Sequence, residues 1–131
     1  MSRVLCNGCV IGMLVTFAAC GGTSSPSSPS PTPSPNPSSA TVTITASGVS
    51  PKTVQVAVGG HVTFVNNDTR SHTIDSNPHP AHTDCPEINQ VGLLQPGQSR
   101  DTASLSVARS CGYHDHSAAS DTTMQGTIAI Q

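Results

Sequence analysis

Apolar and polar residues alternate along most of the chain after residue 40. The alternation is clearest from Val42 to Ala46, where aliphatic residues alternate with threonines. The same period of two, or a short apolar run, recurs at 54–58, 62–64, 73–75, 92–94, 105–107 and 128–130. This period is typical of half-buried β-strands, and no window has an apolar stripe of helical period. The pattern predicts an all-β sandwich of about seven short strands over residues 40–131.

The first 20 residues have a different pattern. Arg3 provides a positive start, residues 10–19 are mostly apolar, and small residues precede Cys20. This order is typical of an export signal, and its apolar run is about ten residues, against about 20 for a membrane-spanning helix. The tetrapeptide from Phe17 to Cys20 resembles the lipobox of bacterial lipoproteins. That resemblance implies a signal peptide over 1–20 and lipidation of Cys20, which would anchor the protein to a bacterial membrane, facing the periplasm or the exterior.

Residues 21–39 are rich in serine and proline and contain no Val, Ile, Leu, Met or aromatic residue. With no side chains to bury and many fixed φ angles, this segment is predicted to be a disordered, extended linker. Its position predicts a spacer that holds a domain over 40–131 away from a membrane surface.

Charge and aromatic content narrow the possible functions. The chain has 5 Lys and Arg against 7 Asp and Glu, so no basic surface is available for a nucleic acid. It has two Phe, one Tyr and no Trp, and we therefore expect an aliphatic core.

Metal-binding side chains are concentrated in two stretches. The stretch from Cys111 to Met124 contains a thiol, two imidazoles (His114 and His116) and a thioether, which bind soft or borderline transition metals such as copper. The segment 77–90 contains three prolines, two histidines and a cysteine. Structureless connections of that length in compact domains are usually functional or disordered.

Five segments together resemble the cupredoxins, the blue-copper family. They are 51–68, His72-Thr-Ile, Leu94-Gln-Pro-Gly97, Cys111-Gly-Tyr-His114 and Met124-Gln-Gly-Thr-Ile128. The resemblance implies a Greek-key β-sandwich that binds one copper ion and passes single electrons to a redox partner protein. It also implies ligand roles for His72 as the first histidine, Cys111 as the thiolate, His114 as the second histidine and Met124 as the weak axial ligand.

The spacing of this ligand group leaves a second arrangement open. Nine residues separate His114 from Met124, and an alignment anchored on Met124 places the family's cysteine position at His116. Side chains alternate between the two faces of a strand. A strand that continues to His116 would therefore place both histidines on one face and Cys111 on the other.

A second cysteine, Cys85, could form a disulfide with Cys111 and so prevent Cys111 from binding a metal. Cysteine pairs in exported domains commonly form disulfides. A Cys85–Cys111 bond would close a loop of about 25 residues, stabilise the domain by roughly 3 kcal/mol and remove the thiolate ligand. The imidazoles of His72, His114 and His116 would then remain as ligands, and His79 or His82 could add a fourth. A set of three or four imidazole nitrogens suits Cu(II) or Zn(II). Met124 would either bind Cu(I) or pack in the core.

Two functions follow. The first is an exported, membrane-tethered, copper-binding protein that transfers electrons or handles copper. The alternative is a metal-free, disulfide-stapled β-sandwich that serves as a binding or adhesion module. The His114-Asp-His116 sequence is similar to the His-x-His of copper-zinc superoxide dismutases, but their other ligand motifs are not recognisable here. No catalytic motif is present, so no enzymatic activity is predicted.

Overall fold

A computed structural model describes residues 35–131 of the chain. The predictions for the signal peptide, for Cys20 and for most of the serine- and proline-rich linker lie outside the described residues. Within residues 35–131, no helix is long and apolar enough to cross a bilayer.

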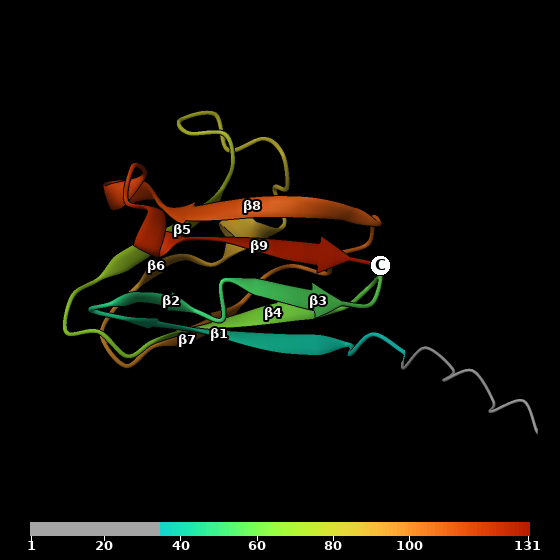
Figure 1. Ribbon diagram of the computed structural model, residues 1–131, viewed down its shortest axis with the longest axis horizontal. Helices are drawn as coiled ribbons and strands as arrows, with labels where there is room; N and C mark the ends of the chain where they lie inside the picture. Colours follow the sequence, from blue (N-terminus) through green and yellow to red (C-terminus); the bar gives the residue numbers. More distant parts are fainter. Residues whose placement is uncertain (1–34) are drawn as a thin grey trace, which may run out of the picture. The chain divides into compact units, whose positions relative to one another are not determined.

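The described chain forms nine β-strands in two sheets (Figure 1). In chain order they are β1 (Ser39–Thr45), β2 (Gly48–Ser50), β3 (Thr53–Val56), β4 (His61–Asn66), β5 (His72–Ser76), β6 (Gly92–Leu94), β7 (Ser99–Asp101), β8 (Arg109–Asp115) and β9 (Gln125–Ile130). One sheet has the order β2-β1-β4-β7 and the other β3-β9-β8-β5-β6. The predicted all-β class is confirmed.

The predicted set lacked three of the nine strands, β2, β7 and β8, and the edge strands β2 and β7 are too short to show an alternation of their own. β2 and β7 have three residues each, and all three residues of β7 are exposed. The prediction of a strand over 105–107 is wrong. Leu105 forms only an isolated bridge to Gly60.

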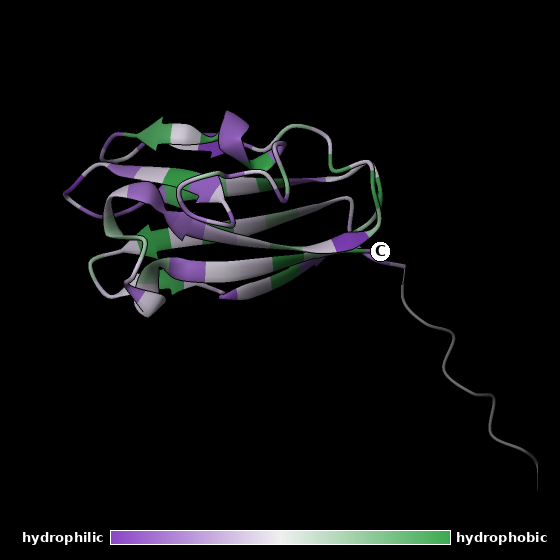
Figure 2. Cartoon of the chain, turned by 90° about the horizontal axis from the view of Figure 1, so that it is seen from above, coloured by the Kyte–Doolittle hydropathy of each residue, from purple (hydrophilic) through white to green (hydrophobic). Residues whose placement is uncertain are grey.

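Alternation places one face of each sheet in a shared core. Val42 and Ile44 of β1 are buried, and Figure 2 shows apolar bands crossing the strands between polar ones. Phe64 of β4 and Tyr113 of β8 join the two sheets through an edge-to-face contact with ring centroids 5.0 Å apart. The remaining core is aliphatic, in agreement with the aromatic-poor composition.

The pairing of β5 with β8 sets the positions of the functional side chains. Asp75 lies opposite His114, and Ile74 lies opposite Asp115, in an antiparallel register. Because side chains alternate, Cys111 and Tyr113 face the core while His114 projects from the outer face of this sheet. The parity argument therefore holds, since Cys111 and His114 lie on opposite faces.

The long connection between β5 and β6 lies against β8 and is held at several points (Figure 1). Cys85, within this connection, forms a disulfide with Cys111 of β8, with Cα atoms 5.9 Å apart. Asn89 accepts a hydrogen bond from the Ser76 backbone N–H at 2.8 Å and donates one to the His82 carbonyl at 2.9 Å. The disulfide alternative is thus confirmed, and the connection is an ordered loop with its own hydrogen bonds.

Candidate metal centre

Four histidines meet where the loop after β5 covers the outer face of β8. Their ligand nitrogens all lie within 4.8 Å of one another. The residues of this four-histidine site are His79, His82, His114 and His116. Two come from the loop and two from the end of β8 and the turn that follows, so the site requires both segments in place.

His114 is the buried member of the four-histidine site. Its Nδ1 lies 2.8 Å from Asn77 Oδ1, and an amide oxygen can only accept, so Nδ1–H donates to it. The other nitrogen, Nε2, is buried and has no hydrogen-bond partner. A buried polar atom without a partner costs free energy, which a bound cation at Nε2 would recover.

Burial lowers the pKa of His114 below its ordinary value, and the neighbouring His82 and His79 lower it further, against the opposing effect of Asp75. The ring is therefore neutral at pH 7, and Nε2 carries a lone pair. A neutral imidazole is the form that binds a metal.

His116 and His82 have the spacing of two ligands of one ion. Nδ1 of His116 lies 3.3 Å from Nε2 of His82. Two nitrogens at about 2.0–2.1 Å from a tetrahedral Zn²⁺ lie about 3.3 Å apart. His79 completes the group, with its ring centroid 5.1 Å from that of His116 and 5.4 Å from that of His114. His79 and His116 are exposed, which leaves the site open to solvent.

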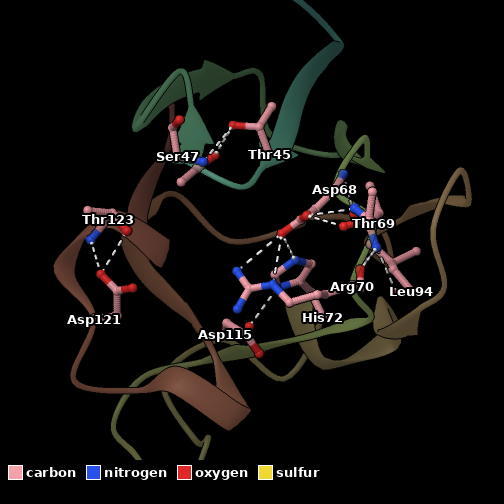
Figure 3. A network of polar contacts seen from close by, with 12 residues as sticks. Thr45, Ser47, Asp68, Thr69, Arg70, His72, Leu94, Asp115, Asp121 and Thr123 are labelled. Carbon is pink, nitrogen blue, oxygen red and sulfur yellow. Dashed lines mark hydrogen bonds and ion pairs between the residues drawn. The ribbon is translucent and has the colours of Figure 1, made fainter.

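His72 lies elsewhere, at the end of the sandwich, with both ring nitrogens in contact with carboxylates (Figure 3). Its Nδ1 is 2.7 Å from Asp115 Oδ2, and its Nε2 is 3.1 Å from Asp68 Oδ2. Arg70 lies 3.2 Å from the same Asp68 oxygen. The His72 ring is 3% exposed. Carboxylates contact both of its ring nitrogens, so neither nitrogen faces an open position for a metal in this arrangement.

The hydrogen-bond pattern around Asp68 stabilises its charged form. Burial by itself would raise the pKa of Asp68. Hydrogen bonds from His72 and Thr69 and the charge of Arg70 together lower that pKa from 3.8 to about 2. The carboxylate therefore stays ionised, and it belongs to a structural ion-pair network.

Met124 lies beside His72 and does not belong to the four-histidine site. It is buried and lines a cavity of about 160 Å³ together with Arg70, His72 and Asp115. Cys111 is in the disulfide. The residues singled out in the sequence thus separate into a group of four histidines, a His72–Met124 group and a disulfide.

Sequence reasoning missed Asp75 and Asn77, which border the four-histidine site. Asp75 Oδ2 lies 3.3 Å from His116 Nδ1 and 3.7 Å from His82 Nδ1. Neither residue carries a recognisable motif. Their role depends on the register that places Asp75 opposite His114, and no local pattern reveals that register.

Several solved structures of cupredoxins have a similar fold. A purple cupredoxin from Nitrosopumilus maritimus is 18% identical with a TM-score of 0.55, over 70% of this chain and 99% of that one. Oxidised plastocyanin from Dryopteris crassirhizoma is 20% identical with a TM-score of 0.54, over 70% and 99%. Auracyanin from Roseiflexus castenholzii is 14% identical with a TM-score of 0.55, over 73% and 98%. No protein-family profile and no curated protein matches the chain. At these identities the likeness shows the fold, and the described domain has the cupredoxin fold.

The donor residues fit a copper ion of a different type from the blue-copper centre implied by the sequence resemblance. That centre needs a thiolate, and Cys111 is bonded to Cys85. The four-histidine site instead offers imidazole nitrogens alone, a donor set that suits Cu(II) or Zn(II).

Proposed function

We propose that this protein is a copper-binding protein of the bacterial cell envelope, which holds one copper ion in the four-histidine site. One observation carries the proposal: four imidazoles converge around the buried, unpartnered Nε2 of His114. Hydrophobic packing alone gives no reason to gather four polar rings there.

Copper is the preferred metal on general chemical grounds. A site of nitrogen donors binds Cu²⁺ more tightly than the other divalent first-row ions, including Zn²⁺. The cupredoxin fold of the domain supports the same choice. Zinc remains chemically compatible with four imidazoles and is therefore the competing metal to include in every titration.

The donor set favours copper handling over fast electron transfer. A centre of two histidines, a thiolate and a long thioether bond suits both copper oxidation states, whereas this site has no sulfur ligand. Two of its four histidines are exposed, which gives copper and a partner protein direct access. We therefore propose that the protein binds copper and passes it on.

The proposed location rests on the N-terminal sequence. The export signal, the lipobox-like tetrapeptide that ends at Cys20 and the proline-rich linker support a lipid-anchored domain outside the cytoplasm. A structural disulfide agrees with an oxidising compartment. Fractionation of cells that express the full chain or its Cys20→Ala variant tests this. The variant should leave the membrane fraction, and equal membrane retention of both would contradict the anchor.

Copper titration of the full chain tests the metal site. The wild type should retain one Cu(II) per chain after gel filtration and show only weak visible absorption. The double variant His82→Ala/His116→Ala should lose this copper, because two of the four ligands are gone. His61→Ala is the matched control, since His61 is a half-exposed histidine on β4, outside the site.

The opposite result has a clear meaning. If the wild type retains no Cu(II) at micromolar concentration, the copper proposal fails and the metal-free, disulfide-stapled binding module takes its place. If the double variant retains copper as the wild type does, the four-histidine site is not where copper binds.

A further inference from the structure

One carboxylate is built into the wall of the four-histidine site. Among the close contacts between histidine nitrogens and carboxylate oxygens in residues 35–131, every one that involves a member of the site is made to Asp75. The Asp75 side chain is 15% exposed, and its Oδ2 lies 3.3 Å from His116 Nδ1. This distance allows the oxygen to serve as a further ligand of an ion bound at His116 Nδ1.

The β5–β8 register fixes the position of Asp75. It lies directly opposite His114, so both side chains project from the same face of the sheet. A carboxylate on a paired strand cannot swing away as one on a flexible loop could. A cation bound by His114 therefore always has this negative charge beside it.

Charge and ligand softness both discriminate between the two copper oxidation states. A carboxylate attracts a divalent ion about twice as strongly as a monovalent ion at the same distance. Nitrogen and oxygen donors suit Cu(II), whereas Cu(I) is selected by thiolate and thioether sulfur. Within residues 35–131, the sulfur atoms lie outside the four-histidine site: Cys111 is in the disulfide with Cys85, and Met124 lies with His72.

We propose that Asp75 makes the four-histidine site selective for Cu(II) over Cu(I), so that the protein carries its copper in the oxidised state. This inference rests on the proposed function and defines its cargo. The site holds a divalent ion in a nitrogen and oxygen environment, and release follows transfer of Cu(II) to a stronger Cu(II) ligand.

The affinities of the full chain for Cu(II) and for Cu(I) test this selectivity separately. Each is measured by competition with a chromogenic chelator for that oxidation state, for the wild type, Asp75→Asn and Asp84→Asn. Asp84 is an exposed acid in the loop that carries His79 and His82, and its variant makes the same change in net charge as Asp75→Asn. Circular dichroism checks that each variant is folded.

Asp75→Asn should weaken Cu(II) binding by about 10- to 100-fold, the usual effect of removing a residue that supports metal ligands. Its Cu(I) affinity should stay within a few-fold of the wild type. The copper reduction potential should then rise by about 59 to 118 mV, at 59 mV for each tenfold change in a one-electron couple. The Cu(II) electron paramagnetic resonance spectrum should shift as the charged carboxylate neighbour becomes a neutral amide, and Asp84→Asn should match the wild type in every measurement.

Two results would overturn the inference while the copper site stands. One is an Asp75→Asn protein with wild-type potential and spectrum, and the other is an equal loss of Cu(I) and Cu(II) affinity. A wild type that binds neither ion would instead remove the proposed function itself.

Discussion

The four-histidine site and the His72 network use the same kinds of side chain in opposite proportions. At the end of the sandwich, one imidazole lies between two carboxylates, Asp68 and Asp115, with Arg70 close by. On the outer face of β8, four imidazoles share one carboxylate, that of Asp75. In the first group, the carboxylates are paired with the His72 ring and with Arg70. In the second, imidazoles outnumber carboxylates four to one, and Nε2 of His114 has no protein partner, which leaves it available to a cation.

This comparison separates a structural histidine from a ligand histidine by what surrounds the ring. Both His72 and His114 are almost fully buried, so burial does not distinguish them. The difference is that both nitrogens of His72 have acceptor partners, whereas Nε2 of His114 has none. An unsatisfied nitrogen that faces other imidazoles is the better indicator of a metal site.

The largest expected effect comes from His72→Ala. Removing this ring leaves the buried carboxylates of Asp68 and Asp115 without their shared partner. Breaking a buried ion pair typically costs about 3–5 kcal/mol. Urea unfolding should show a loss of this size in the free energy of unfolding. The folded variant should still bind one Cu(II).

His61→Ala is the control for this substitution. His61 lies 4.0 Å from Asp101, with both side chains about half exposed, and exposed pairs contribute about 1 kcal/mol or less. A His72→Ala protein that is as stable as His61→Ala, or one that is folded and unable to bind copper, would remove the distinction between the two regions.

Loss of the disulfide should affect both stability and metal binding. The double variant Cys85→Ser/Cys111→Ser frees the loop that carries His79 and His82, and the bond closes a loop with a sequence separation of 26. The chain-entropy estimate predicts a loss of about 3 kcal/mol in the free energy of unfolding. Cu(II) affinity should fall because two of the ligands are no longer held beside β8.

The matched control is Cys6→Ser/Cys9→Ser, which exchanges two cysteines within the segment predicted to be an export signal. Isothermal titration and urea unfolding should give wild-type values for this variant. Unchanged Cu(II) affinity in the disulfide-free protein would show that the loop keeps its position without the bond.

Lowering the pH should protonate the four-histidine site and the His72 network in different pH ranges. The lowered pKa of His114 means that the folded ring gains its proton at a lower pH than in the unfolded chain. Its contribution to stability is therefore present above the ordinary value of 6.5 and is lost as the pH falls through the lowered folded value. Copper release should begin in this range as protons compete for the imidazoles.

The Asp68 carboxylate responds at lower pH. Its pKa falls from 3.8 to about 2 on folding, so its contribution is complete above about pH 4 and is lost as the pH falls to about 2. Unfolding of the wild type and Asp68→Asn from pH 7 to pH 2 measures this. The difference in free energy of unfolding should be constant above pH 4 and shrink below it. A difference that stays constant down to pH 2 would contradict the network.

The sequence alone predicted the features that depend on local pattern. Alternation from Val42 to Ala46 and in the later segments was enough for an all-β sandwich, since a period of two suits only strands. The parity of Cys111 and His114 correctly placed these side chains on opposite faces. Cys85 indicated the disulfide because exported domains with two cysteines usually pair them.

Tertiary structure decided which histidines meet. The sequence resemblance grouped His72 with His114, and His79 and His82 were only possible additions. The fold places Asp68 and Asp115 on either side of His72, while the disulfide holds the loop so that His79 and His82 face β8. Neither Asp75 nor Asn77 could be assigned beforehand, because their importance comes from the β5–β8 register and the course of the loop. Chain order limits which residues can bind a metal, but only strand pairing and loop closure bring their nitrogens within one ion's reach.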